Sequence, residues 1–160
     1  MTAYEARWLD EREREIWIAL ASLLIRVPSA LHTQLQRDSG VSFFEYQVLA
    51  GLSEAPDRTL RMSRLAVLAD GSLSRLSHVV KRMEEAGWVK RRPDPEDGRY
   101  TLATLADAGW EKLVEAAPGH VAEVRRLVFD PLSKAQRRQL QEISRRIGEA
   151  SVVDEAGSGE

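Results

Sequence analysis

The segment from Ser72 to Arg99 constrains the fold of this chain more than any other part of the sequence. Its first half carries apolar residues at intervals of three, four and three: Leu73, Leu76, Val80 and Met83. This spacing is the apolar stripe of an amphipathic helix. Ser72 is suited to cap the first turn of that helix, and Gly87 can end it in the left-handed conformation. The stripe alone also fits an ordinary surface helix whose charged face is solvated.

The residues before this helix predict how it is embedded. A short apolar helix is predicted from about Met62 to Ala69, and Asp70-Gly71 makes a tight connection to the longer helix. Two helices joined in this way are typical of a helix-turn-helix motif. A pair of packed helices in an all-α core has the same pattern, so the connection alone does not decide between them.

A β-hairpin is predicted after the longer helix. Trp88 to Arg92 forms a first strand with three consecutive basic residues, and Arg99 to Leu105 forms a second strand. Between them, the prolines, aspartates and glycine of residues 93–98 favour a tight turn. Leu60 can add a short strand beside the hairpin. The hairpin can be the wing of a DNA-binding motif, or its charges can serve only to keep an exposed edge soluble.

Positive charge is concentrated in this central region. From Arg58 to Tyr100 there are ten Lys/Arg and six Asp/Glu, a local net charge of +4, whereas the rest of the chain carries a net charge of −6. A basic block on an acidic chain predicts one surface that binds a polyanion. The total charge of −2 argues against a protein that coats nucleic acid over its whole surface.

The stretch from about Leu60 to Gly109 resembles the winged helix-turn-helix of the MarR family, the multiple-antibiotic-resistance type of bacterial transcriptional regulator. The matching landmarks are Leu65-Ala66, Ser77, Val80, Arg82-Met83-Glu84, Ala86-Gly87, Val89, Arg91-Arg92, Asp94-Pro95-Glu96-Asp97-Gly98-Arg99, Leu105 and Asp107-Ala108-Gly109. The chain departs from the family pattern at His78 and Gly98, where arginine is usual, and at Ala106, where threonine is usual. The resemblance implies a homodimeric regulator, commonly a repressor, that binds a palindromic operator in double-stranded DNA.

The expected DNA contacts follow from this motif, in which Ser72 opens a helix that lies in the major groove. The residues expected at base edges are Ser74, Arg75, Ser77 and His78, and those expected at phosphates are Lys81, Arg82, Lys90, Arg91 and Arg92. Arg75 can form a bidentate pair with guanine. Arg99 is expected in the minor groove, held by a charged hydrogen bond to Asp97.

The resemblance also implies a ligand. MarR-type proteins are commonly released from DNA by small, often aromatic, anionic molecules that bind between the dimerisation helices and the DNA-binding unit. On that resemblance, the candidate lining residues are Trp17, Arg26, His32, Phe44, Tyr46 and Gln47. Aromatic residues at helical spacing also fit an ordinary core.

The whole chain is predicted to be mainly α with a small β-hairpin wing, and a single domain by its length. Its predicted parts are N-terminal helices (7–55), the winged helix-turn-helix (58–106), C-terminal dimerisation helices (107–149) and a disordered tail (150–160). The terminal helices carry more apolar residues than a small DNA-binding unit needs. A symmetric homodimer would bury them, and a monomeric helical core is the alternative.

The flanking helices have recognisable ends. The first is predicted from Trp8 to Arg37 with a kink at Pro28, and Ser42 with Glu45 opens the second through a capping box. A long helix is predicted from Asp107 to Phe129. The final helix is predicted to follow a second capping box, formed by Ser133 and Gln136.

Other functions have no support in the sequence. No nucleophile elbow, glycine-rich phosphate loop or HExxH motif is present, so no enzyme is predicted. Cysteine is absent and His32, His78 and His120 lie far apart, so neither a metal nor a cofactor is expected. Without a signal peptide or a long uninterrupted apolar run, a cytoplasmic protein that does not contact membranes is predicted. The alternatives are a winged-helix module that binds proteins without an operator, and an architectural DNA binder indifferent to sequence.

Overall fold

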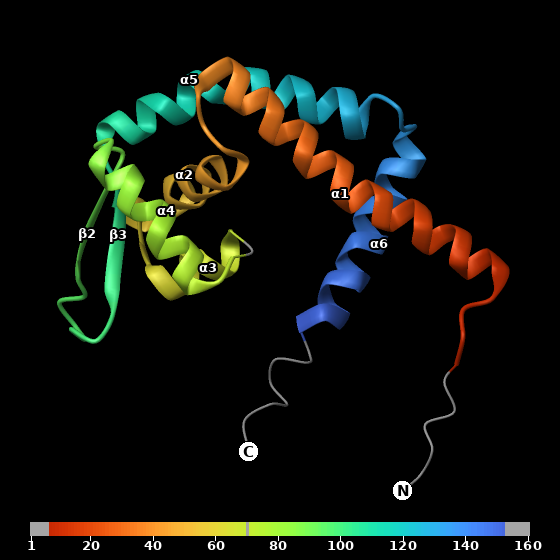
Figure 1. The fold of residues 1–160 in the computed structure, drawn as a ribbon, viewed down its shortest axis with the longest axis horizontal. Helices are drawn as coiled ribbons and strands as arrows, with labels where there is room; N and C mark the ends of the chain where they lie inside the picture. Colours follow the sequence, from red (N-terminus) through yellow and green to blue (C-terminus); the bar gives the residue numbers. More distant parts are fainter. Residues whose placement is uncertain (1–6, 70, 153–160) are drawn as a thin grey trace, which may run out of the picture. The chain divides into compact units, whose positions relative to one another are not determined.

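The computed structural model describes residues 7–69 and 71–152, and the chain divides into two compact units, Met1–His120 and Val121–Glu160. In chain order the elements are α1 (Glu11–Ser39), α2 (Phe43–Glu54), the 3-10 turn η1 (Pro56–Arg58), β1 (Thr59–Arg61), α3 (Met62–Leu68), α4 (Leu73–Glu85), β2 (Val89–Pro93), β3 (Thr101–Leu105), α5 (Asp107–Val124), the π-helical turn η2 (Arg125–Phe129) and α6 (Lys134–Val152) (Figure 1). The predicted fold class, mainly α with a small β wing, is confirmed.

The first helix begins and ends at residues suited to those places. The backbone N–H of Glu13 donates to the Asp10 carboxylate (2.8 Å), and the N–H of Asp10 donates to the Glu13 carboxylate (3.0 Å). This reciprocal pair is a capping box that the sequence analysis did not identify. Gly40 ends the helix with φ of 67°, which glycine adopts without a Cβ clash. Helical structure continues through Pro28 to Ser39, so the proline does not interrupt the element.

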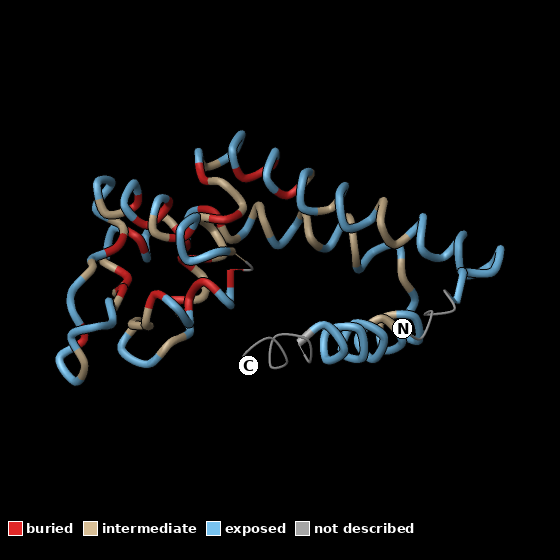
Figure 2. The backbone as a smooth tube through the Cα atoms, turned by 60° about the horizontal axis from the view of Figure 1, so that its bottom comes forward, coloured by how far each residue is buried: buried red, intermediate tan, exposed pale blue. Residues whose placement is uncertain are grey.

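The second helix begins at the predicted capping box. The N–H of Glu45 donates to Ser42 Oγ (3.0 Å), and the N–H of Ser42 donates to the Glu45 carboxylate (2.8 Å). Residues of α2, α3, α4 and the sheet then form one apolar core: Phe44, Val48, Leu49, Leu52, Met62, Leu65, Leu76, Val80, Met83, Val89, Ala103 and Leu105. Figure 2 shows the buried segments gathered where these elements meet. The core therefore fixes α4 against the sheet.

The three strands form an antiparallel sheet in the order β1-β3-β2. Thr59 of β1 pairs with Thr104, and Val89 of β2 pairs with Leu105. The short strand predicted at Leu60 is confirmed. The second strand of the hairpin begins at Thr101 rather than at Arg99, because the tight turn occupies the intervening residues.

Two details of the C-terminal helices differ from the predictions. The helix predicted to reach Phe129 is α-helical only to Val124 and continues as a π-helical turn. The tail predicted from residue 150 overlaps the last residues of α6, which extends to Val152; the rest of that tail lies outside the described residues. The second capping box is present, since the N–H of Ser133 donates to Gln136 Oε1 (2.9 Å).

The first helix is more apolar than the sequence analysis recognised. It contains an 18-residue stretch with a mean hydropathy of 1.4, of which 6% is buried. By length and composition alone this helix could cross a membrane, and it is the one such helix among the described residues. Soluble proteins with an apolar helix pass the same test, so this is weak evidence for a membrane.

Candidate DNA interface

Helix α4 presents one apolar and one polar face. Ser72 Oγ accepts a hydrogen bond from the backbone N–H of Arg75 (3.1 Å), so the predicted N-cap is confirmed. The buried face holds Leu76, Val79, Val80 and Met83. The remaining face carries most of the predicted contact residues of this helix: Ser74, Arg75, His78, Lys81 and Arg82, all exposed, with Ser77 half-buried beside them. Each can meet DNA without disturbing the core.

The connection between α3 and α4 is packed against α2. The N–H of Gly71 donates to the carbonyl of Ala66 (3.0 Å), which closes the turn of the helix-turn-helix. A Cβ at Gly71 would lie 2.7 Å from Cε2 of Phe44, closer than real Cβ contacts. The Phe44 ring therefore occupies the space beside this turn, and only glycine fits there without displacing it.

Arg75 lies on the same aromatic ring. Its guanidinium carbon is 4.5 Å from the centroid of Phe44. This is a cation–π contact. Among the described residues, the Arg75 side chain makes no hydrogen bond or ion pair, so its N–H groups remain available for DNA.

Two other predicted DNA contacts are paired with carboxylates. Arg91 donates from Nε and Nη2 to Glu84 (3.1 and 2.8 Å), and these hydrogen bonds are the main cause of the lowered pKa of the Glu84 carboxyl. Arg82 Nη2 lies 3.4 Å from Glu45 Oε1. A phosphate must compete with these carboxylates for the arginines.

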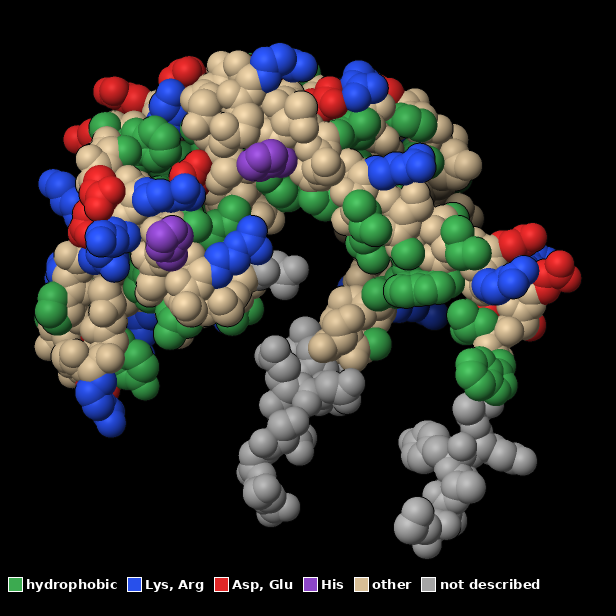
Figure 3. Space-filling view, viewed as in Figure 1, with side chains coloured by type: hydrophobic (Ala, Val, Ile, Leu, Met, Phe, Trp, Pro, Cys, Tyr) green, Lys and Arg blue, Asp and Glu red, His purple; other side chains and the backbone are tan. Residues whose placement is uncertain are grey.

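The strand alternation separates the three basic residues of β2. Val89 is buried against the core and Arg91, two residues later, lies on the same side, toward Glu84 of α4. Lys90 and Arg92 are exposed and, by alternation, project from the opposite side of the sheet. The predicted cluster of phosphate-binding side chains is thus split between the two faces of the sheet. Figure 3 shows the resulting mixture of basic and acidic side chains over this unit.

The wing carries the predicted arginine. Arg99 is 84% exposed, and its Nε and Nη2 donate to the Asp97 carboxylate (2.9 and 2.6 Å). These bonds are the leading cause of a lowered pKa at Asp97 and a raised pKa at Arg99. The predicted Asp97–Arg99 pair is therefore present, and the Arg99 side chain remains largely exposed at the turn.

A partly buried ion pair fixes the base of the wing. Asp94 is buried, and its carboxylate accepts hydrogen bonds from Arg61 Nε (2.7 Å) and from the backbone N–H of Glu96 (2.9 Å). The bond from Glu96 contributes most to the lowered pKa of the Asp94 carboxyl. The Arg61 guanidinium also lies over the ring of Tyr100, 4.4 Å from its centroid. Sequence reasoning missed Arg61, because its partner lies 33 residues away.

The structure brings helix and wing together around a small cavity. Its volume is about 180 Å3, and its polar lining includes Ser77 of α4 with Arg91 and Arg99 of the hairpin. Three residues predicted to contact DNA from different elements thus meet at one place. Leu73 and Tyr100 supply apolar surface at the same cavity.

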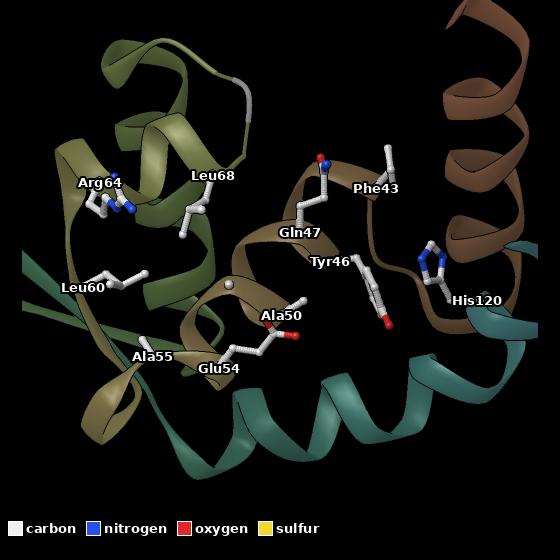
Figure 4. A pocket seen from close by; sticks show the side chains of 11 residues that line it. Phe43, Tyr46, Gln47, Ala50, Glu54, Ala55, Leu60, Arg64, Leu68 and His120 are labelled. Atoms are coloured by element: carbon white, nitrogen blue, oxygen red, sulfur yellow. The ribbon is translucent and has the colours of Figure 1, made fainter. Parts of the chain in front are cut away.

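A larger cavity of about 470 Å3 lies beside α2 (Figure 4). Of the six predicted ligand residues, Tyr46 and Gln47 line it. Phe44 instead faces Gly71 and Arg75, and His32 Nδ1 accepts a hydrogen bond from the N–H of Phe43 (3.4 Å). Trp17 and Arg26 are exposed on α1 and do not line this cavity.

The other lining residues were not identified from the sequence, among them Phe43, Arg64 and His120. The His120 ring lies 4.1 Å from the ring of Tyr46 and 6.0 Å from that of Phe43. Burial lowers the pKa of His120 and raises that of Tyr46. His120 Nδ1 is buried and has no hydrogen-bond partner among the described residues. His120 comes from α5, distant in sequence, so no spacing rule could associate it with α2.

Comparisons with known proteins agree with this geometry. A model of the MarR family matches residues 39–99, which include α2 and the helix-turn-helix. The transcriptional repressor MprA of Escherichia coli (strain K12) is 23% identical over 133 residues, covering 81% of this chain and 75% of that protein.

Two solved structures are similar over nearly the whole chain. Sco3205, a MarR family transcriptional regulator from Streptomyces coelicolor solved in complex with DNA, is 43% identical; the match covers 92% of both chains with a TM-score of 0.87. AbsC, a MarR family regulator from the same organism, is 34% identical with a TM-score of 0.84, over 91% of this chain and 97% of that one. The chain therefore belongs to the MarR family of transcriptional regulators.

Proposed function

We propose that this protein is a homodimeric repressor in the cytoplasm that binds a palindromic operator in double-stranded DNA and is released by a small aromatic molecule. The capped helix α4, with its exposed polar face, carries the DNA-binding part of the proposal. Support also comes from the similarity to Sco3205, which was solved in complex with DNA and matches 92% of this chain. In each protomer α4 lies in a major groove and Arg99 reaches the adjacent minor groove.

The homodimer is supported by the apolar surfaces of the terminal helices. Ile16, Trp17 and Leu24 of α1 are more than half exposed, as is Ile143 of α6. Figure 3 shows apolar side chains along α1. Exposed apolar surface of this extent is typical of a protein–protein interface. A second copy related by two-fold symmetry would cover it and would present two α4 helices to one palindrome.

The proposed ligand site is the cavity beside α2. The rings of Phe43, Tyr46 and His120 line it, and Arg64 adds a cationic side chain. In Figure 4 the Tyr46 and His120 rings lie next to one another. Aromatic rings with a few polar groups are typical of sites for small planar molecules. The buried Nδ1 of His120 is a free polar atom that such a ligand can satisfy.

A footprint of the full-length protein on genomic DNA tests the proposal, beginning with the promoter region beside its own gene. We expect a protected palindrome with half-sites about one helical turn apart, roughly 34–36 Å. Affinity should fall steeply with salt because phosphates are neutralised. Equal binding to all duplexes, or binding to none, would contradict an operator-binding repressor.

A further inference from the structure

One aromatic ring supports both the turn of the helix-turn-helix and an arginine of the DNA-facing surface. Phe44 is 8% exposed, and its ring fills the space beside Gly71. The Arg75 guanidinium stacks on the same ring at 4.5 Å. Phe44 belongs to α2, so the position of an α4 side chain depends on a residue from another helix.

Arg75 is held differently from Arg82, Arg91 and Arg99, which are paired with carboxylates. Arg91 and Arg99 use Nε and Nη2 to bind Glu84 and Asp97. Arg82 is paired with Glu45. Within the described part of the chain, no carboxylate or carbonyl accepts from the Arg75 guanidinium. Stacking thus holds the face of this group while its N–H edge stays unoccupied.

That geometry suits the recognition of a base. A guanidinium forms a bidentate pair with guanine O6 and N7 through its N–H edge, in the plane of the group. A cation–π contact uses the perpendicular direction and consumes no donor. A side chain that is already ordered also loses less conformational entropy when it binds.

We propose that Phe44 is a positioning residue that orients Arg75 for one base pair of the operator and so sets the specificity at that position. The inference rests on the proposed function, because it requires sequence-specific DNA binding. It adds a residue that does not itself face DNA. The base preference that depends on Phe44 should be the same one that Arg75 determines.

The test is selection from a random duplex library with the full-length protein, followed by affinity measurements on the selected duplex and on its single-base variants. The proteins compared are wild type, Phe44→Leu, Arg75→Ala and the double variant. Arg75→Ala should abolish the preference at one base pair of each half-site. Phe44→Leu should reduce the preference at that same base pair about two- to fivefold, the range expected for an exposed cation–π contact.

The double variant separates positioning from a structural role. If Phe44 acts through Arg75, Phe44→Leu will change no preference in the Arg75→Ala background. Equal weakening on all sequences, or the same loss in both backgrounds, would overturn the inference. So would an unchanged preference in Phe44→Leu, or no single base pair that depends on Arg75. Phe44→Met is a second variant without a ring, with an unbranched side chain of nearly the same volume as leucine, and thermal unfolding verifies that each variant is folded.

Trp110→Leu is the matched control. It removes a second cation–π contact of the same length, between Arg58 and Trp110 at 4.5 Å, away from α4. This variant should keep every base preference of the wild type. If the wild-type protein itself selects no sequence, the proposed function fails. If the wild-type protein selects a palindrome and Phe44→Leu shows the same base preferences, only the positioning role of Phe44 is refuted.

Discussion

At the scale of single residues, the side chains expected to contact DNA differ in how freely they can do so. Arg75 has an aromatic neighbour and open donors, whereas Arg91 already makes two hydrogen bonds to Glu84. Arg99 is paired with Asp97 yet remains largely exposed. The same residue type therefore takes different parts in one interface, according to its neighbours.

Arg99→Ala should weaken operator binding strongly while leaving the fold intact. Among the described residues, the arginine makes its side-chain hydrogen bonds to Asp97 alone, and it is 84% exposed, so its removal disturbs no core contact. Loss of one specific arginine contact is expected to reduce affinity roughly tenfold to a hundredfold. Fluorescence anisotropy with the footprinted duplex measures this. Wild-type affinity in a folded variant would remove the wing from the mechanism.

His120 should make stability depend on pH. Burial lowers its pKa in the folded state below the ordinary 6.5, so at pH values just below 6.5 the unfolded chain binds more protons than the folded chain. The free energy of unfolding should therefore fall as the pH is lowered through this range. Urea midpoints at pH 7.5 and 5.5 should differ less for His120→Gln than for wild type.

Gln47→Ala, which changes a non-titrating residue that lines the same cavity, is the control for that measurement. It should show the same difference between the two pH values as the wild-type protein. An identical pH dependence in wild type and His120→Gln would show that burial of this ring does not control the protonation of the folded state.

At the scale of helices and strands, local chemistry explains most of the agreement between prediction and structure. Ser42, Ser72 and Ser133 each cap a helix as predicted, because a cap depends on residues three positions apart. The pairs Arg82–Glu45 and Arg61–Asp94 join residues more than 30 positions apart. No periodicity connects such residues, so the roles of Glu45, Arg61 and Phe44 became evident only in the fold.

The strands show the same division between local and distant information. The basic run Lys90-Arg91-Arg92 predicts a strand correctly, and alternation alone places its middle residue on a different face from the other two. Alternation does not predict which face of the sheet packs against α4. The burial of Val89 and the bond from Arg91 to Glu84 supply that answer.

The start of α5 should tolerate no side chain at Gly109. A Cβ there would collide with the carbonyl oxygen of Trp88 and lie 2.7 Å from Leu105 Cδ1. Because backbone cannot easily move aside, Gly109→Ala should lower the free energy of unfolding by about 1–3 kcal/mol. Chemical denaturation measures the change.

Gly148→Ala is the matched control within a helix. Apart from its chain neighbours and the helix's own backbone, no described atom lies within 4 Å of a Cβ at this position in α6. The substitution should raise the free energy of unfolding by about 0.5–1 kcal/mol, because alanine is the better helix former. A loss of stability equal to that of Gly109→Ala would refute the steric explanation.

At the scale of the whole molecule, helices α1 and α6 each expose apolar side chains, such as Ile16 and Ile143. Leu23 lies on the apolar stripe of α1 with Ile16, seven residues earlier. Ile25, 73% exposed, is about half a turn away from that stripe. Substitutions at Leu23 and Ile25 therefore distinguish an interface on one side of α1 from association through any apolar residue of the helix.

Leu23→Asp should dissociate the proposed homodimer, because a charge would be buried in the interface without a partner. Ile25→Asp should leave the dimer intact. Sedimentation equilibrium of the full-length variants at micromolar concentration measures the mass of each. Monomers in both variants, or dimers in both, would contradict an interface on the stripe that contains Ile16 and Leu23.

The pairing of Arg82, Arg91 and Arg99 with carboxylates has a kinetic consequence for a protein that must search a chromosome. Unrelated DNA offers only phosphates, and each phosphate must displace a carboxylate that is already in place. Such encounters gain less from counterion release than encounters with unpaired arginines would. The protein therefore dissociates sooner from non-operator DNA. More of it stays free to reach the operator, where base contacts offset the cost of replacing the carboxylates.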